Sequence, residues 1–310
     1  MRSQDFFDTL VMNLQSEIIN LKLPWRLPKT KFEGLDDMLE ALQFEFLRNA
    51  LLAGFLTSVA CGIIGTFVVV NRIVFLSGGI AHAAYGGIGL AFFFGLPYSV
   101  GTLGFALLTA MVMAAVTLKA RQRSDTIIGV LWAVGMALGV ILLDLTPGYN
   151  VDLMSFLFGS ILTVPTSDLW LMLVLDCVIL LTVGYFYNDF LALSYDEDFA
   201  QIRGIRVRSL YFLLLALVAL SVVMIIRIVG LILVIALLTI PPYIAEKFSV
   251  SLLKMMLFSF ILSCVFSTVG LWLAYTFNLT SGATIIMVAG ACFFFSLFVE
   301  LLRSKRIFFS

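Results

Sequence analysis

The chain has little charge and almost no histidine. Of its 310 residues only 12% are charged and one, His82, is a histidine, whereas 62% are hydrophobic and the mean hydropathy is +1.10. A soluble globular domain is about a quarter charged, so this composition excludes an ordinary soluble domain and predicts an integral membrane protein. The formal net charge is zero, so the charge balance indicates neither a nucleic acid nor an acidic ligand as a partner.

The sequence also lacks the patterns of disulfide frameworks, metal clusters and common hydrolases. Its four cysteines lie far apart in apolar runs, and no pair has metal-ligand spacing. There is no Gly-x-Ser-x-Gly element, no HExxH motif and no GxxxxGK[ST] phosphate-binding loop. We therefore expect neither an enzyme nor a permanently bound cofactor.

Apolar segments of membrane-spanning length begin near residue 48. A transmembrane helix needs roughly 20 apolar residues, which predicts an all-α, polytopic bundle of eight or nine spans. The seventh candidate is separated from the sixth only by Arg227 to Gly230, so eight full spans with one partial element fit equally well. The candidates cover residues 49–71, 79–96, 99–118, 126–145, 167–187, 209–226, 229–246, 252–276 and 282–302.

The N-terminal 43 residues differ from the rest of the chain. They mix acidic and basic residues and lack the basic, apolar and small-residue order of a cleavable signal. Residues 6–23 and 34–47 alternate apolar and charged positions with helical period, which predicts surface-lying helices. We expect an amphipathic extension over 1–43, a membrane domain over 44–303 and a short tail over 304–310.

Basic residues are concentrated in alternate loops. Twelve of the thirteen Lys and Arg residues after Arg48 occur there, and Arg227 is the exception. The positive-inside rule places these loops, and with them the C-terminus, in the cytoplasm. With nine spans the N-terminal segment is then outside. The twelve are Arg72, Lys119, Arg121, Arg123, Arg203, Arg206, Arg208, Lys247, Lys254, Arg303, Lys305 and Arg306.

Few ionisable groups fall at membrane depth, where burial costs several kcal/mol unless the group is paired or hydrated. His82 is either a metal ligand or a packing residue, and Tyr85, one turn later, either lines the same face or packs. Asp144 and Asp152 flank an outer loop and either receive an ion or are solvated. Asp176, in mid-span, either lies on a pathway or is a neutral acid hydrogen-bonded between helices.

Small residues surround His82 in the stretch SGGIAHAAYGGIG, residues 77–89. Gly78 and Gly86 lie four residues before and after the histidine, and Gly79 and Gly87 lie beside them. This spacing predicts smooth helix stripes that allow close helix contact or leave room for an ion. Further along the chain, Pro241 and Pro242 predict a break near the cytoplasmic end of the seventh span.

The loop 188–208, NDFLALSYDEDFAQIRGIRVR, has the composition of a short surface helix. Asp196 and Glu197 form its acidic start, Phe199 and Ile202 are apolar, and Gly204 ends it. An apolar face in such a loop indicates a docking partner, unless the segment is an ordinary solvated loop helix.

Five segments together resemble the membrane permease of zinc/manganese/iron ABC importers. They are FLSGGIAHAAYGGIGLAFFFG, GYNVDLMSFLFGSILTV, LSYDEDFAQIRGI, VGLILVIALLTIPPYIA and LTSGATIIMVAG, in the family's order over about residues 45–302. The resemblance implies an ABC-importer permease fold over 44–303 in the cytoplasmic membrane of a prokaryote. It implies a coupling helix near 196–204, where Phe199 and Ile202 fit an ATPase groove and Gly204 permits the turn.

The same resemblance implies partners and a cargo. The permease is expected to form a homodimer within membrane lipid, with cytoplasmic ABC ATPase subunits and an extracytoplasmic metal-binding protein, and to move Zn, Mn or Fe by alternating access. The alternatives are a permease for a metal chelate such as a siderophore or corrinoid, which the sparse intramembrane polar groups disfavour, and an autonomous channel or secondary carrier.

One departure from the family concerns the possible ligands. Where the family has GDALSH this chain has SGGIAH, so Gly78 replaces an acid and Ala81 a hydroxyl, while His82 remains. A single neutral imidazole holds no divalent metal tightly. The resemblance therefore implies that other groups complete the ligand set.

Overall fold

The computed structural model describes residues 44–119, 124–146, 159, 161, 164–231 and 234–307, which are helical and contain no strand. The predicted extension 1–43, Asp152 and residues 308–310 lie outside this part of the chain. The helices are α3 (Glu45–Val70), α4 (Val74–Phe94), α5 (Tyr98–Lys119), α6 (Ser124–Asp144), α8 (Thr166–Tyr185), α9 (Tyr187–Tyr195), α10 (Glu197–Ile202), α11 (Val207–Val229), α12 (Val234–Glu246), α13 (Leu252–Phe277) and α14 (Ser281–Ile307).

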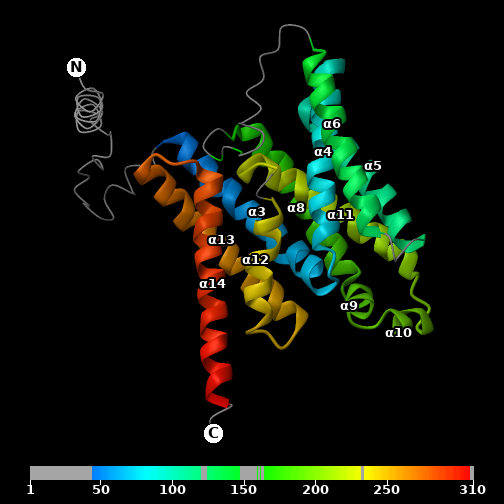
Figure 1. The fold of residues 1–310 in the computed structure, drawn as a ribbon, viewed down its shortest axis with the longest axis vertical. Coiled ribbons are helices and arrows are strands. Elements are labelled where there is room, and N and C mark those ends of the chain that lie inside the picture. The colour runs from blue at the N-terminus through cyan, green and yellow to red at the C-terminus, as the bar shows by residue number, and fades with distance from the viewer. Residues whose placement is uncertain are drawn as a thin grey trace, which may run out of the picture. The chain divides into compact units, whose positions relative to one another are not determined.

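Eight of the described helices are long and apolar enough to cross a membrane. The predicted all-α, multi-pass architecture is thus confirmed, in the form with one partial element. That element is α12, whose 13 residues are too few for a full span. Figure 1 shows α9, α10, the turn after α12 and the end of α14 towards one end of the bundle. Predicted cytoplasmic charges follow α10 at Arg203 and α12 at Lys247.

Two groups of helices surround α11. In one, α4 packs between α5 and α6; in the other, α3 packs against α8, α12 and α13 (Figure 1). Glycine allows the close approach within the first group, because a Cβ on Gly89 would lie 2.5 Å from the carbonyl oxygen of Gly139. A Cβ on Gly87 would lie 2.5 Å from the carbonyl oxygen of Gly101. The small-residue spacing in α4 therefore places backbone against backbone.

The helix α12 continues through Pro241 and Pro242, so these residues do not break it as the sequence predicted. Pro242 has no N–H to donate to the carbonyl of Leu238, four residues earlier. That carbonyl and the Pro242 ring lie against Gly65 of α3, where a Cβ would be 2.6 Å from the oxygen. The absence of a side chain at Gly65 leaves room for the proline pair inside a continuous helix.

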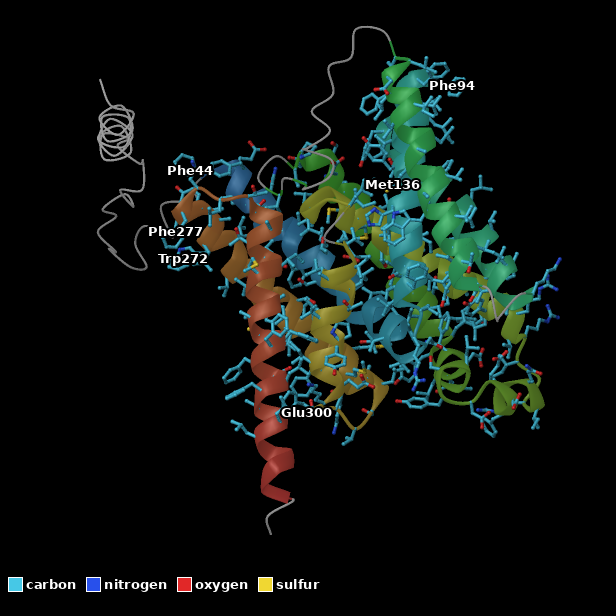
Figure 2. All side chains as sticks on the ribbon, in the orientation of Figure 1. Phe44, Phe94, Met136, Trp272, Phe277 and Glu300 are labelled. Atoms are coloured by element: carbon cyan, nitrogen blue, oxygen red, sulfur yellow. The ribbon has the colours of Figure 1, made fainter. Side chains whose placement is uncertain are left out.

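Large apolar side chains cover much of the outer surface. On α14, Phe294 and Phe295 are each 69% exposed, and Phe298 is exposed on the same helix. Figure 2 shows Phe44, Trp272 and Phe277 gathered where α3 begins and α13 ends, with Phe94 at the end of α4. Such surfaces suit lipid contact rather than water.

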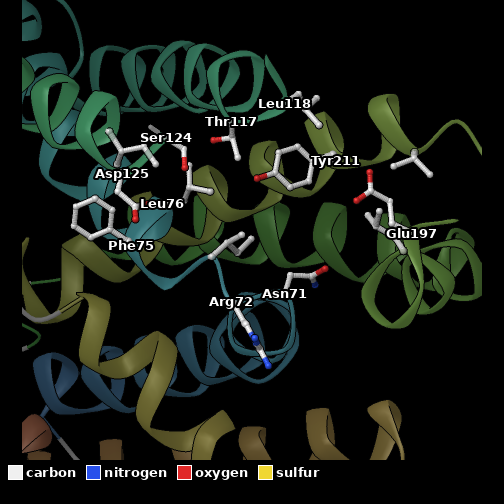
Figure 3. Close-up of a pocket in the computed structure, with 14 residues that line it drawn as sticks. Asn71, Arg72, Phe75, Leu76, Thr117, Leu118, Ser124, Asp125, Glu197 and Tyr211 are labelled. Carbon is white, nitrogen blue, oxygen red and sulfur yellow. The ribbon is translucent and has the colours of Figure 1, made fainter. Parts of the chain in front are cut away.

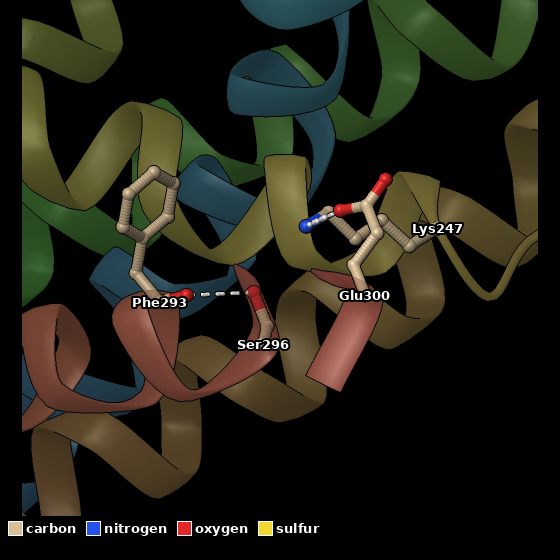
Figure 4. A network of polar contacts seen from close by, with 4 residues as sticks. All are labelled: Lys247, Phe293, Ser296 and Glu300. Atoms are coloured by element: carbon tan, nitrogen blue, oxygen red, sulfur yellow. Dashed lines mark hydrogen bonds and ion pairs between the residues drawn. The ribbon is translucent and has the colours of Figure 1, made fainter. Parts of the chain in front are cut away.

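An ion pair between Lys247 and Glu300 joins the end of α12 to α14. The Lys247 ammonium, just after α12, lies 2.6 Å from Oε2 of Glu300 in α14 (Figure 4). The same ammonium lies 4.8 Å from the ring centroid of Tyr243, and Ser296 donates to the carbonyl of Phe293. The Glu300 side chain is 61% exposed, so this pair contributes little to stability, but it links the end of α12 to α14.

Candidate functional site

The sole histidine lies deep in the bundle against an aromatic ring. His82 is 8% exposed in the middle of α4, and its imidazole stacks on the indole of Trp132 from α6. The ring centroids are 4.1 Å apart and the planes differ by 12°. Trp132 Nε1 donates to Met136 Sδ, 3.2 Å away and one turn along α6, which holds the indole in place.

The remaining surroundings of His82 are mostly apolar. Its Nδ1 is buried and has no hydrogen-bond partner among the described residues. One turn earlier, a Cβ on Gly78 would lie only 2.5 Å from Ile235 Cδ1 of α12. Beside it, a Cβ on Gly79 would lie 2.6 Å from Ile128 Cγ2 of α6. The imidazole nitrogen thus has no hydrogen-bond partner among the described residues, and the preceding turn offers no carboxylate because Gly78 and Gly79 occupy it.

Two other predicted pathway residues lie further along the α4–α6 contact. Tyr85 is buried and packs its ring and carbonyl against Gly139 of α6. Asp144, the last residue of α6, is exposed and close enough to Tyr85 to interact electrostatically. His82, Tyr85 and Asp144 therefore follow one helix–helix contact, whereas Asp152 lies outside the described residues.

Asp176 belongs to a different place in the fold. It is 2% exposed in α8, which packs against α3 rather than in the group around α4. Neither carboxylate oxygen has a hydrogen-bond partner in the described part of the chain, and Cys61 of α3 lies within electrostatic reach. Asp176 is therefore not a neighbour of His82, and among the described residues no three His, Cys, Asp or Glu side chains can hold one metal ion.

The predicted surface helix is present as α10. Asp196 caps it, since its Oδ1 accepts a hydrogen bond from the backbone N–H of Phe199 at 2.9 Å. Phe199 is 49% and Ile202 86% exposed, so α10 presents two apolar side chains outward. Gly204 has φ +79°, a backbone conformation that other residues adopt at a cost, and it turns the chain towards α11.

Three features of the site could not be found by reading the sequence. Trp132 and Ile235 are ordinary apolar residues of their own helices, and only the packing of α6 and α12 on α4 brings them to His82. The third is a cavity of about 310 Å³ at the ends of α4, α5, α6 and α11. Its lining includes Thr117 and Asp125, which are eight residues apart in sequence, and the distant Glu197.

A family model and known proteins match almost the whole membrane part of the chain. Residues 43–300 match the model of the ABC 3 transport family. An uncharacterised membrane protein of Synechocystis sp. is 51% identical over 263 residues, which cover 85% of this chain and 94% of the relative. The manganese transport system membrane protein MntC of Listeria monocytogenes is 32% identical, over 82% of this chain and 90% of the relative.

Among solved structures, the chain resembles PsaBC from Streptococcus pneumoniae in complex with Fab. The TM-score is 0.77 and the sequence identity 31%, over 85% of this chain and 95% of that one. These matches cover the helices that hold His82, α10 and the cavity at the charged end.

Proposed function

The chain belongs to the ABC 3 transport family, and we propose that it is the permease of an ATP-driven importer of a divalent transition metal, with Mn, Zn and Fe as the candidate cargoes. The family match over residues 43–300 carries this proposal. The relative named for manganese transport supports Mn among the three. A permease of this kind contains no ATP site, which agrees with the missing phosphate-binding loop.

The helix α10 is the proposed contact with the ATPase subunit. Phe199 and Ile202 project apolar surface into the solvent, which costs free energy unless a partner covers it. The Asp196 cap and the Gly204 turn hold the helix at a defined angle between α9 and α11. Movement of the docked ATPase then moves α10 as a rigid piece and transmits force to the spans through α11.

His82 is the proposed pathway ligand for the cargo. A neutral imidazole suits Mn, Fe and Zn, and one imidazole binds them weakly enough for release. Its own helix supplies no carboxylate from the preceding turn, because the residues there are Gly78 and Gly79. Water and a second permease copy are the proposed sources of the other ligands, with Tyr85 and Asp144 nearer the outer end of the same helix contact.

The complete transporter contains two copies of this permease, two cytoplasmic ATPase subunits and an extracytoplasmic metal-binding protein. The basic loops and the C-terminus then face the cytoplasm, as the distribution of Lys and Arg predicts. The predicted topology puts Asp144 and Asp152 on the opposite side, where the binding protein is proposed to deliver the metal. Asp176 has no assigned part in this pathway.

Reconstitution in vesicles with the ATPase and the binding protein tests the proposal. His82→Ala should reduce ATP-driven uptake of Mn, Zn and Fe while membrane insertion stays normal. Phe199→Ala should leave metal binding intact but uncouple the two activities, so that ATP hydrolysis no longer drives metal uptake. A matched control is Leu181→Ala, which removes a similarly apolar side chain, 74% exposed on α8, and should transport normally. Unchanged uptake in the His82 and Phe199 variants would refute the proposal.

A further inference from the structure

The cavity at the charged end of the bundle lies directly below the His82 contact. Its wall includes Phe75 and Leu76 of α4 and Asp125 and Ile128 of α6, the two helices that carry His82 and Trp132. Leu76 precedes His82 by six residues and Asp125 precedes Trp132 by seven, which is about 10 Å of helix in each case. The Phe75 ring, which is 44% exposed, has its centroid 6.1 Å from that of Trp132.

The polar groups that line this cavity include the carboxylates of Asp125, which is exposed, and Glu197, and hydroxyls such as that of Thr117; the side chains of Asn71 and Arg72 also line it. Figure 3 shows Thr117, Ser124 and Asp125 along one side of the cavity and Glu197 at the far end, while the Arg72 guanidinium points away from them. Thr117 Oγ1 is buried and has no hydrogen-bond partner in the described part of the chain. Most buried polar atoms have a protein or water partner, so a hydroxyl without one at a cavity wall leaves a position for water or an ion.

The size and chemistry of the cavity fit a hydrated divalent cation. At about 30 Å³ per water molecule, an ion with six waters occupies roughly 180 Å³, which the cavity of about 310 Å³ accommodates. Carboxylate and hydroxyl oxygens suit hard cations such as Mn²⁺, which keep much of their water when bound. No three acidic, His or Cys side chains of the described residues converge on one metal, so an ion here must retain water ligands.

From these observations we infer that the cavity is a binding site for the divalent cation after it leaves His82, with Asp125 as the charged ligand and Thr117 as a hydroxyl ligand. This inference rests on the proposed transport function, and it makes the cavity the last binding site of the cation before its release into the cytoplasm. The Phe75 ring on the cavity wall neighbours the Trp132 ring, which in turn stacks on His82.

The cavity also connects the cation to the ATPase contact. Glu197 lies in the first turn of α10, so a displacement of α10 changes the distance between the Glu197 and Asp125 carboxylates. Two separated carboxylates hold a cation more tightly when they approach each other. Docking and release of the ATPase thus alternate between a tighter and a looser site.

Titration of the full-length permease in lipid nanodiscs with Mn²⁺ alone tests the inference, with free Mn²⁺ measured by electron paramagnetic resonance. Asp125→Asn should raise the dissociation constant of one class of Mn²⁺ sites by about tenfold or more. Thr117→Val has the same shape and leaves the helix charges unchanged, and it should weaken the same class by a smaller factor. The control Asp189→Asn removes an acid of α9 outside the cavity lining and should bind as the natural chain does.

A second measurement separates this inference from the proposed function. The sole histidine gives one labelled imidazole signal by nuclear magnetic resonance, and Zn²⁺ should shift it in both the natural chain and Asp125→Asn. If His82 responds and Mn²⁺ binding is unchanged in both Asp125→Asn and Thr117→Val, the cavity site is overturned and the pathway ligand stands. If the Asp125-dependent class is present but His82 never responds, the cavity site stands and the proposed pathway fails.

Discussion

The imidazole of His82 and the indole of Trp132 lie nearly parallel, with ring centroids 4.1 Å apart. The contact joins α4 to α6 at the only histidine of the chain. Because the indole covers a face of the imidazole, a ligand reaches an imidazole nitrogen from the edge of the ring. The indole therefore orients the imidazole, and changes at Trp132 should be detectable at His82.

Replacing Trp132 by alanine should release the imidazole. An aromatic pair contributes about 0.5–1.5 kcal/mol beyond burial, so the free energy of unfolding should fall by at least that amount. The imidazole proton signals should move downfield, because protons over an indole face are shielded. Trp132→Phe keeps a smaller ring and should give an intermediate shift. Identical His82 spectra in the natural chain and Trp132→Ala would contradict the stacked geometry.

Restoring an acid at residue 78 should require space from α12. Gly78→Asp alone should lower the free energy of unfolding by about 1–3 kcal/mol, because its Cβ overlaps Ile235 Cδ1. The double variant with Ile235→Ala should recover stability and bind Mn²⁺ more tightly than Ile235→Ala alone, since residues 78 and 82 share a helix face. Thermal unfolding and Mn²⁺ titration measure the two effects. A fully stable Gly78→Asp single variant would show that Ile235 does not limit this position.

Two glycines of neighbouring helices should respond oppositely to alanine. Gly89→Ala should be strongly destabilising, because its Cβ would lie 2.5 Å from the Gly139 carbonyl oxygen and backbone cannot move aside cheaply. Gly104→Ala faces open space and should be neutral or stabilising by up to about 1 kcal/mol through helix propensity. Thermal unfolding of both variants in the same detergent provides the comparison. Equal melting temperatures would argue against the close α4–α6 packing.

Asp176→Asn should leave the protein equally stable or more stable. The carboxylate is buried without a partner among the described residues, and an ionised group at this depth is costly. Asparagine has nearly the same shape and no charge. A decrease of more than about 1 kcal/mol in the free energy of unfolding would mean that the carboxylate makes a favourable interaction that the amide cannot replace.

Some of the site could be predicted from the chain and some could not. His82, the capped helix after Asp196 and the glycine spacing of α4 are local patterns, and each is visible within a few residues. The continuity of α12 through Pro241 and Pro242 could not be predicted from the chain, because it depends on Gly65 of a distant helix. Likewise, the cavity is lined by the beginning of α4, the end of α5 and the beginnings of α6 and α11, and only the packing of these helices brings the segments together.

The sequence by itself determined the class of the protein, because long apolar segments must form helices that satisfy their own backbone hydrogen bonds in a bilayer. It also determined which loops carry the positive charge and which residues of α4 are small. The tertiary structure alone decided which neighbours those small residues meet. Apolar spans are nearly interchangeable in lipid, so the partner of each helix is set by the fit of surfaces in three dimensions. That fit places Trp132 on His82, Ile235 beside Gly78, and Asp176 in a separate part of the bundle.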